Sequence, residues 1–143
     1  MNTDEFRPNF EDELVTGRPD QAIATVQSLP YFVGRSGKTA NTATLSMHLV
    51  MISPGTIARP HYHQHDKTGI YVLAGTVKTR YGEHLDKVSI NQASDFLYIP
   101  PGMLHTAQNW STTRAARAIV ARNAPQEQEN IMPYTIATTP TED

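Results

Sequence analysis

Short apolar runs alternate with polar turn sequences along most of this chain, and the pattern predicts β-strands. The runs are rich in β-branched and aromatic residues, and segments such as SPG, YGEHLD and PPG separate them. No stretch sustains the 3.6-residue period of an amphipathic helix. The expected strands cover residues 22–26, 31–33, 44–52, 56–63, 68–74, 76–81, 87–90, 95–99, 104–110 and 115–121. Many short strands at this spacing indicate an all-β sandwich or barrel.

The strand pattern also divides the chain. Residues 1–21 are polar and mixed and are expected to form an N-terminal arm, whereas residues 22–122 carry the strands of one domain. Residues 123–143 lose the pattern and are expected to form a C-terminal arm and tail. The total of 143 residues is the usual size of a single domain.

Composition excludes several classes of function. The chain has no cysteine, which excludes disulfides, thiolate catalysis and cysteine–zinc sites, so a metal would need nitrogen or oxygen ligands. The formal net charge is -2, without a block of like charges, and this argues against nucleic-acid and membrane partners. The N-terminus lacks the apolar core of a signal peptide, and no apolar run reaches the roughly 18 residues that span a bilayer. We therefore expect a cytoplasmic protein.

Histidines form the main chemical feature of the sequence. His61, His63 and His65 alternate within PGTIARPHYHQHDKTGIYVLAG, residues 54–75. Residues two apart on a strand share a face, so two such imidazoles can bind one ion, although an exposed edge strand can carry the same pattern. A second cluster, SDFLYIPPGMLHTAQN, places His105 just after a proline–glycine turn. A rigid turn suits the positioning of a ligand and favours the metal interpretation.

The two clusters resemble the paired motifs of the cupin superfamily. The residues that match at the family's spacing are Gly55, His61, His63, Gly75, Pro100, Gly102, His105 and Asn109. Ser94 stands where the second motif usually has its first glycine. The resemblance implies a cupin double-stranded β-helix, which is a jelly-roll barrel. It also implies a divalent metal bound by three histidines and a glutamate.

The chain departs from the family at the glutamate, because Thr68 occupies that position. Three alternatives follow. Water completes the coordination by His61, His63 and His105; or His65 adds a fourth imidazole, as in some small cupins; or the site is metal-free. The candidate ions are Zn, Fe, Ni and Mn, and imidazole ligands suit the first three of these.

Other residues are candidates for the pocket. Alternation over residues 44–52 places His48 on one face with Val50 and Ile52, which makes it a candidate proton carrier if that face lines the barrel. A histidine in such a position is more often structural. By its parity with His61, Arg59 is expected to point inward near the mouth. Thr68 and Asn109 are expected in the pocket wall, while His84 lies in an expected surface hairpin.

The flanking sequences resemble small bacterial cupins that include the zinc-dependent polyketide cyclase type, whose metal is held by four histidines. This resemblance implies a metal-dependent enzyme with cyclase or lyase-type chemistry on a small organic substrate. A metal-dependent dioxygenase and a non-catalytic cupin that binds a small molecule or a metal are the alternatives. We also expect a homodimer, because Tyr71 and Leu73 fall on the face opposite Thr68 and would expose apolar surface.

Overall fold

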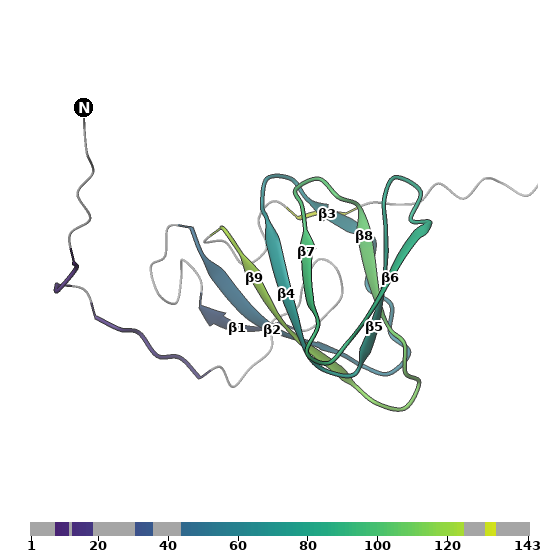
Figure 1. Cartoon of the computed structure of the whole chain (residues 1–143), viewed down its shortest axis with the longest axis horizontal. Helices are drawn as coiled ribbons and strands as arrows, with labels where there is room; N and C mark the ends of the chain where they lie inside the picture. The colour runs from purple at the N-terminus through teal and green to yellow at the C-terminus, as the bar shows by residue number, and fades with distance from the viewer. Residues whose placement is uncertain (1–7, 12, 19–30, 36–43, 125–130, 134–143) are drawn as a thin grey trace, which may run out of the picture.

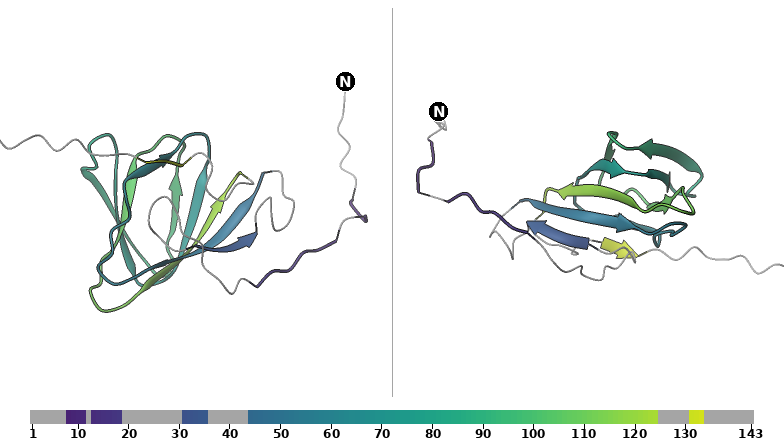
Figure 2. Two further views of the ribbon diagram at one scale, coloured as in Figure 1. Left: turned by 180° about the vertical axis from the view of Figure 1, so that it is seen from behind. Right: turned by 90° about the horizontal axis from the view of Figure 1, so that it is seen from below.

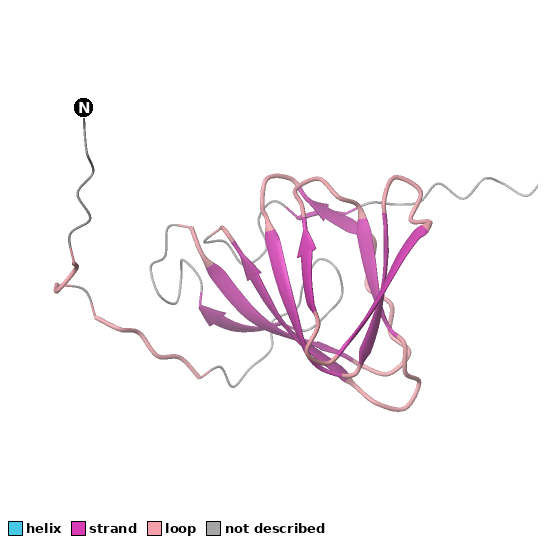
Figure 3. Cartoon of the chain, in the orientation of Figure 1, coloured by secondary structure: helices cyan, strands magenta, loops and turns pink. Residues whose placement is uncertain are grey.

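The computed structural model describes residues 8–11, 13–18, 31–35, 44–124 and 131–133 (Figure 1). Every regular element in these ranges is a β-strand (Figure 3). No helix that could cross a membrane occurs in the described ranges. The all-β class predicted from the alternation is confirmed.

The described residues form ten strands in two antiparallel sheets that face each other (Figures 1 and 2). The first sheet has the order β1-β2-β9-β4-β7, and the second has the order β10-β3-β8-β5-β6. The strands are β1 (Tyr31–Arg35), β2 (Ser46–Ile52), β3 (His61–His63), β4 (Thr68–Ala74), β5 (Thr76–Tyr81), β6 (Lys87–Gln92), β7 (Phe96–Ile99), β8 (His105–Asn109), β9 (Ala116–Arg122) and β10 (Ile131–Pro133). Successive strands pass repeatedly from one sheet to the other, as in the predicted jelly-roll barrel.

Most of the expected strands are present, and two of them have the expected bounds, β4 and β5. The strand expected over 56–63 is shorter, because only 61–63 forms β3 and Ile57 makes an isolated bridge with Gln108. Strand β10 was not expected. It lies within 123–143 and pairs with β3, the strand that carries two of the histidines. The strand expected over 22–26 lies outside the described residues.

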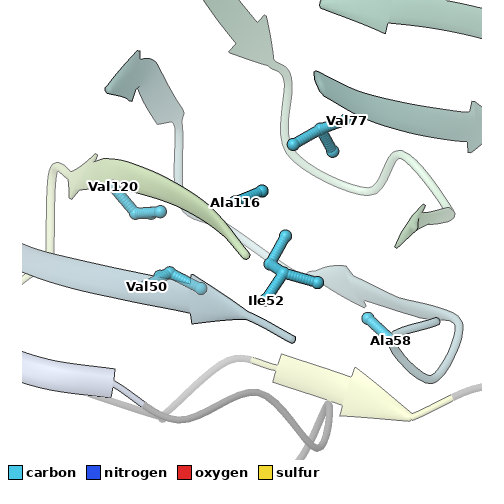
Figure 4. Close-up of a cluster of buried hydrophobic side chains, with 6 residues drawn as sticks. All are labelled: Val50, Ile52, Ala58, Val77, Ala116 and Val120. Carbon is cyan, nitrogen blue, oxygen red and sulfur yellow. The ribbon is translucent and has the colours of Figure 1, made fainter. Parts of the chain in front are cut away.

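Alternation along the strands builds the interior of the barrel. In β2 and β9 every second residue is buried, which is the pattern of a strand with one face in a core. Figure 4 shows the cluster of buried apolar side chains that results. Its members are Val50, Ile52, Ala58, Val77, Ala116 and Val120. These side chains come from both sheets, so their burial holds the two sheets together.

The inner face of the first sheet changes from apolar to polar along its strands. At one end Val50 and Ile52 pair in register with alanines of β9. At the other end Ser46 and Thr68 both pair with Arg122, and all three side chains are buried. The barrel interior therefore has an apolar end and a polar end.

Two of the turn positions with left-handed backbone angles fall at glycine positions of the cupin motifs. Gly75 joins β4 to β5 with φ of 84°, and a Cβ placed there would lie 2.9 Å from the Cα of Ala116. Both the left-handed angle and the close approach require glycine. Ser94 has φ of 78° in the turn between β6 and β7. This left-handed angle accounts physically for the glycine that the cupin motif usually has at the Ser94 position.

Candidate metal centre

Three buried histidines from two adjacent strands converge inside the barrel. His61 and His63 point inward from β3, and His105 is the first residue of β8 and the register partner of His61. Ring centroids lie 4.3 Å apart for His61 and His105, and 5.4 Å apart for His61 and His63. Those of His63 and His105 are 5.8 Å apart. One ring nitrogen from each residue lies within 4.8 Å of the other two, so the three side chains could hold a metal ion.

Backbone carbonyls orient two of the three rings. The Nδ1 of His61 lies 2.9 Å from the carbonyl oxygen of Arg59, and the Nδ1 of His105 lies 2.9 Å from that of Met103. A carbonyl oxygen can only accept a hydrogen bond, so each Nδ1 carries the hydrogen and donates it. The Nε2 atom then keeps its lone pair. This is the tautomer that a metal-binding histidine needs, and the arrangement is common around metal ligands.

Burial keeps the three imidazoles neutral. It lowers the pKa of His61 to about 4, and the nearby His105 and Arg122 act in the same direction. It lowers the pKa of His63 to about 2, with a further contribution from the charge of Arg122. Burial also lowers the pKa of His105, against the hydrogen bond to Met103. Because a metal binds only the neutral imidazole, the three side chains are ready to bind an ion near neutral pH.

Arg122 is the charged group closest to the histidines among the contacts that the structure describes. Its Nη1 lies 3.5 Å from the Nδ1 of His63, and its side chain is 1 % exposed. The sequence analysis did not single out Arg122. Its parity with the buried residues of β9 was the available signal, since Ala116, Ala118 and Val120 point to the same side.

The histidines form part of the wall of a cavity of about 70 Å³ inside the barrel. Most of the wall is aliphatic, and the hydroxyls in it come from Thr68 and Thr79. Thr68 is 2 % exposed, and its Oγ1 has no hydrogen-bond partner among the described residues. A buried hydroxyl without a protein partner usually binds water or a ligand, so Thr68 is suited to bind a molecule beside the histidines. This agrees with the expectation that Thr68 lines the pocket.

His65 lies apart from the three-histidine group. Strand β3 ends at His63, and the loop that follows interrupts the alternation: His65 is exposed while Asp66 and Thr68 are buried. Two backbone amides hold this loop against the end of β9. Lys67 donates to the Asn123 side chain at 2.7 Å, and Asn123 donates to the Lys67 carbonyl at 3.3 Å. The fourth-imidazole alternative would require this loop to rearrange.

The remaining pocket candidates have different positions. The side chain of Arg59 is exposed, and Ala58 is buried in its place, because Pro60 interrupts the strand and shifts the alternation before His61. His48 is 1 % exposed on the inner face of β2, yet it is not part of the cavity wall. Asn109 is also buried. It donates to the carbonyls of Ile52 and Arg114, so it organises a turn rather than the pocket.

A family model for the cupin domain matches residues 48–122, which include all three converging histidines. The chain belongs to the cupin family. A curated relative, germin-like protein subfamily T member 3 from Arabidopsis thaliana, is 29% identical over 142 residues. That match covers 95% of this cupin and 58% of the relative, so the chain spans little more than half of the plant protein.

Two solved structures show the same fold. The polyketide cyclase RemF from Streptomyces resistomycificus has a TM-score of 0.63 and 16% identity, with 85% of this cupin and 78% of RemF covered. Oxalate decarboxylase from Lactobacillus farciminis has a TM-score of 0.65 and 18% identity, with 79% and 33% covered. At these identities the comparisons establish the cupin barrel of the chain.

Proposed function

We propose that this cupin binds one divalent metal ion through His61, His63 and His105 and uses it in cyclase or lyase-type chemistry on a small organic substrate. The observation that carries the proposal is the convergence of three buried, neutral imidazoles, two of which donate through Nδ1 to backbone carbonyls. The Nε2 atoms of these two rings are available as ligands.

The residues around the histidines fit such an ion. All three proposed ligands are imidazoles, which suit Zn, Fe and Ni; Mn, which prefers oxygen ligands, is the least favoured candidate. When bound, the ion would polarise a substrate carbonyl or lower the pKa of a bound water. The hydroxyl of Thr68 lines the cavity, so it would donate a hydrogen bond to an oxygen of a water or substrate molecule bound beside the three histidines. The aliphatic wall would exclude bulk water and strengthen these polar interactions.

The choice of cyclase or lyase-type chemistry rests on analogy. RemF is described as a polyketide cyclase and the Lactobacillus farciminis protein as an oxalate decarboxylase, and both share the barrel of this chain. The alternative in which a fourth histidine completes the site would need His65, which is exposed. We therefore favour three histidines, with an exogenous ligand at the position where other cupins have glutamate.

A second candidate is a metal-dependent dioxygenase that uses the same three histidines. The observation in its favour is the small, mostly aliphatic cavity beside them, because dioxygen is small and apolar. Metal identity separates the two candidates: bound zinc supports the cyclase or lyase, whereas bound iron and dioxygen uptake with a phenolic or diketone substrate support the dioxygenase.

Elemental analysis of the full chain, purified without added metal, tests the common basis of both candidates. We expect about one divalent ion per chain, and less than a tenth of that in His61→Ala, His63→Ala or His105→Ala. His84→Ala is the matched control, because the side chain of His84 is 75% exposed. Full metal retention in the triple alanine variant would overturn the metal site. A non-catalytic cupin would bind the metal and ligands without turnover.

We also propose that the chain forms a homodimer through the outer face of its first sheet. Met47, Leu73, Phe96 and Tyr98 are 41%, 40%, 80% and 61% exposed, and the ring of Phe96 lies 4.6 Å from that of Tyr71. Large apolar side chains gathered on an exposed sheet face are typical of an interface. Light scattering at micromolar concentration should give the mass of a dimer, and Leu73→Glu should give a monomer. A monomeric wild type would refute the proposal.

A further inference from the structure

A second and larger cavity adjoins the histidine site. Its volume is about 350 Å³, and it lies between β6 and β7, the terminal strands of the two sheets. Four residues line both cavities: Thr79, Leu97, Ile99 and His105. The larger cavity, which we call the seam cavity, therefore leads to one of the three proposed metal ligands.

The two walls of the seam cavity differ in chemistry. Residues of β5 and β6 line one wall and carry hydroxyl and amide groups; they are Thr79, Tyr81, Ser89 and Asn91. Leu97, Ile99 and Met103 contribute apolar side chains to the opposite wall, and Phe96 and Tyr98 complete the lining. A flat molecule with oxygen atoms along one edge and an apolar ring face matches both walls at once.

The orientation of the Asn91 side-chain amide supports a ligand with oxygen atoms at the polar wall. The hydroxyl of Ser89 donates to the Oδ1 of Asn91 at 2.9 Å, which leaves the Nδ2 of Asn91 as the free donor. Among the described residues no protein acceptor takes a hydrogen bond from this NH₂ group. Asn91 is thus prepared to donate to a carbonyl or hydroxyl oxygen of a ligand.

Charge narrows the class of ligand. The described residues that line the two cavities include no aspartate, glutamate, lysine or arginine. In the metal-free protein a charged ligand in the seam cavity would lose its hydration without gaining an opposite charge from the residues that line the cavity, which is unfavourable. A neutral ligand avoids this cost.

We propose that the seam cavity binds a neutral ring compound whose hydroxyl or carbonyl oxygens face Tyr81, Ser89 and Asn91 and whose ring lies against Leu97 and Met103. The identification of this compound as the substrate rests on the proposed function. The binding itself does not require a metal ion. The ligand enters from the seam and reaches the histidine site past His105.

The experiment is a calorimetric or fluorescence titration of the full chain, after dialysis against a chelator, with 2,7-dihydroxynaphthalene. We expect saturable binding at one site, at least tenfold tighter than that of naphthalene-2,7-dicarboxylate or 2,7-dimethylnaphthalene. Equal affinity for the dicarboxylate would overturn the claim that the ligand is neutral. Equal affinity for the dimethyl compound would overturn the claim that the polar wall binds the oxygens of the ligand. Because the protein is metal-free, the outcome is independent of whether the metal proposal holds.

Variants locate the site. Asn91→Leu keeps the side-chain volume and removes the amide, so affinity should fall about tenfold, as for the loss of one hydrogen bond. Gln92→Met is the matched control on the exposed side of β6 and should bind like wild type. Ser89→Trp should fill the cavity and abolish binding, with circular dichroism as the check on folding. Wild-type affinity in Asn91→Leu would overturn the proposed orientation whether or not Ser89→Trp folds.

Discussion

The buried histidines should make the metal-free protein lose stability when the pH falls from 7 to 5. In the unfolded chain a histidine has a pKa of about 6.5. In the folded chain burial lowers the pKa of His61 to about 4 and that of His63 to about 2. The unfolded state therefore binds protons between these values and the folded state does not. Stability is complete above pH 6.5 and is lost as the pH falls below it.

The magnitude follows from these pKa values. At pH 5 an unfolded histidine is mostly protonated while a histidine with a pKa of about 4 is mostly neutral, and the difference amounts to about 2 kcal/mol. His63 contributes a similar amount, and His105 acts in the same direction because burial lowers its pKa as well. The sum for His61 and His63, about 4 kcal/mol, is large against a typical unfolding free energy of about 5–15 kcal/mol.

Urea denaturation of chelator-treated protein at pH 5, 6 and 7 measures this effect. In His63→Asn the loss of stability between pH 7 and pH 5 should be smaller by about 2 kcal/mol than in wild type, because one of the titrating groups is absent. His84→Ala should keep the wild-type pH dependence, since the side chain of His84 is 75% exposed. An unchanged pH dependence in His63→Asn would refute the claim that this imidazole is held neutral by burial.

Three further predictions concern the turns and the loop after β3. Gly75→Ala should destabilise the protein by about 2–5 kcal/mol in thermal or urea unfolding, because a Cβ at this position would lie 2.9 Å from Ala116 Cα. Gly102→Ala is the comparison: Gly102 has φ of 76°, but a Cβ there would have no atom within 4 Å, so the loss should be only about 1–2 kcal/mol. Ser94→Gly should stabilise by up to about 1 kcal/mol, since it relieves a left-handed angle; a loss of stability would contradict that account. His65→Ala should lower zinc affinity less than threefold in a competition titration with a chromophoric chelator, and a loss as large as that of His63→Ala would show that the loop rearranges.

Local alternation predicted the strands and the shared face of His61 and His63, and the resemblance to the cupin motifs implied the barrel and the three-histidine site. The bounds of β4 and β5, and the shared face of His61 and His63, follow from a period of two along the strand. His105 could be added because a proline–glycine turn starts the strand that carries it. These features depend on residues that are close in sequence, and such patterns identify a strand and its faces well.

Features that depend on a break in the strand alternation, or on contacts between residues far apart in sequence, could not be predicted from local patterns. Arg59 was expected inside, but Pro60 shifts the alternation and leaves its side chain exposed. The position of Arg122 beside His63 joins residues that are 59 apart in sequence. The pairing of β10 with β3 is also long-range, and nothing in its three residues distinguishes them from the rest of the tail.

The replacement of glutamate by threonine changes the electrostatics of this cupin site. Thr68 brings a neutral hydroxyl to the position where the family usually supplies a carboxylate, and Arg122, its register partner, adds a positive charge near His63. A divalent ion held by three neutral imidazoles would keep its full charge and attract an oxygen ligand strongly. The nearby cavity walls supply no carboxylate for that role among the described residues. The oxygen would then come from water or from the substrate, and the neutral hydroxyl or carbonyl compound proposed for the seam cavity could supply it.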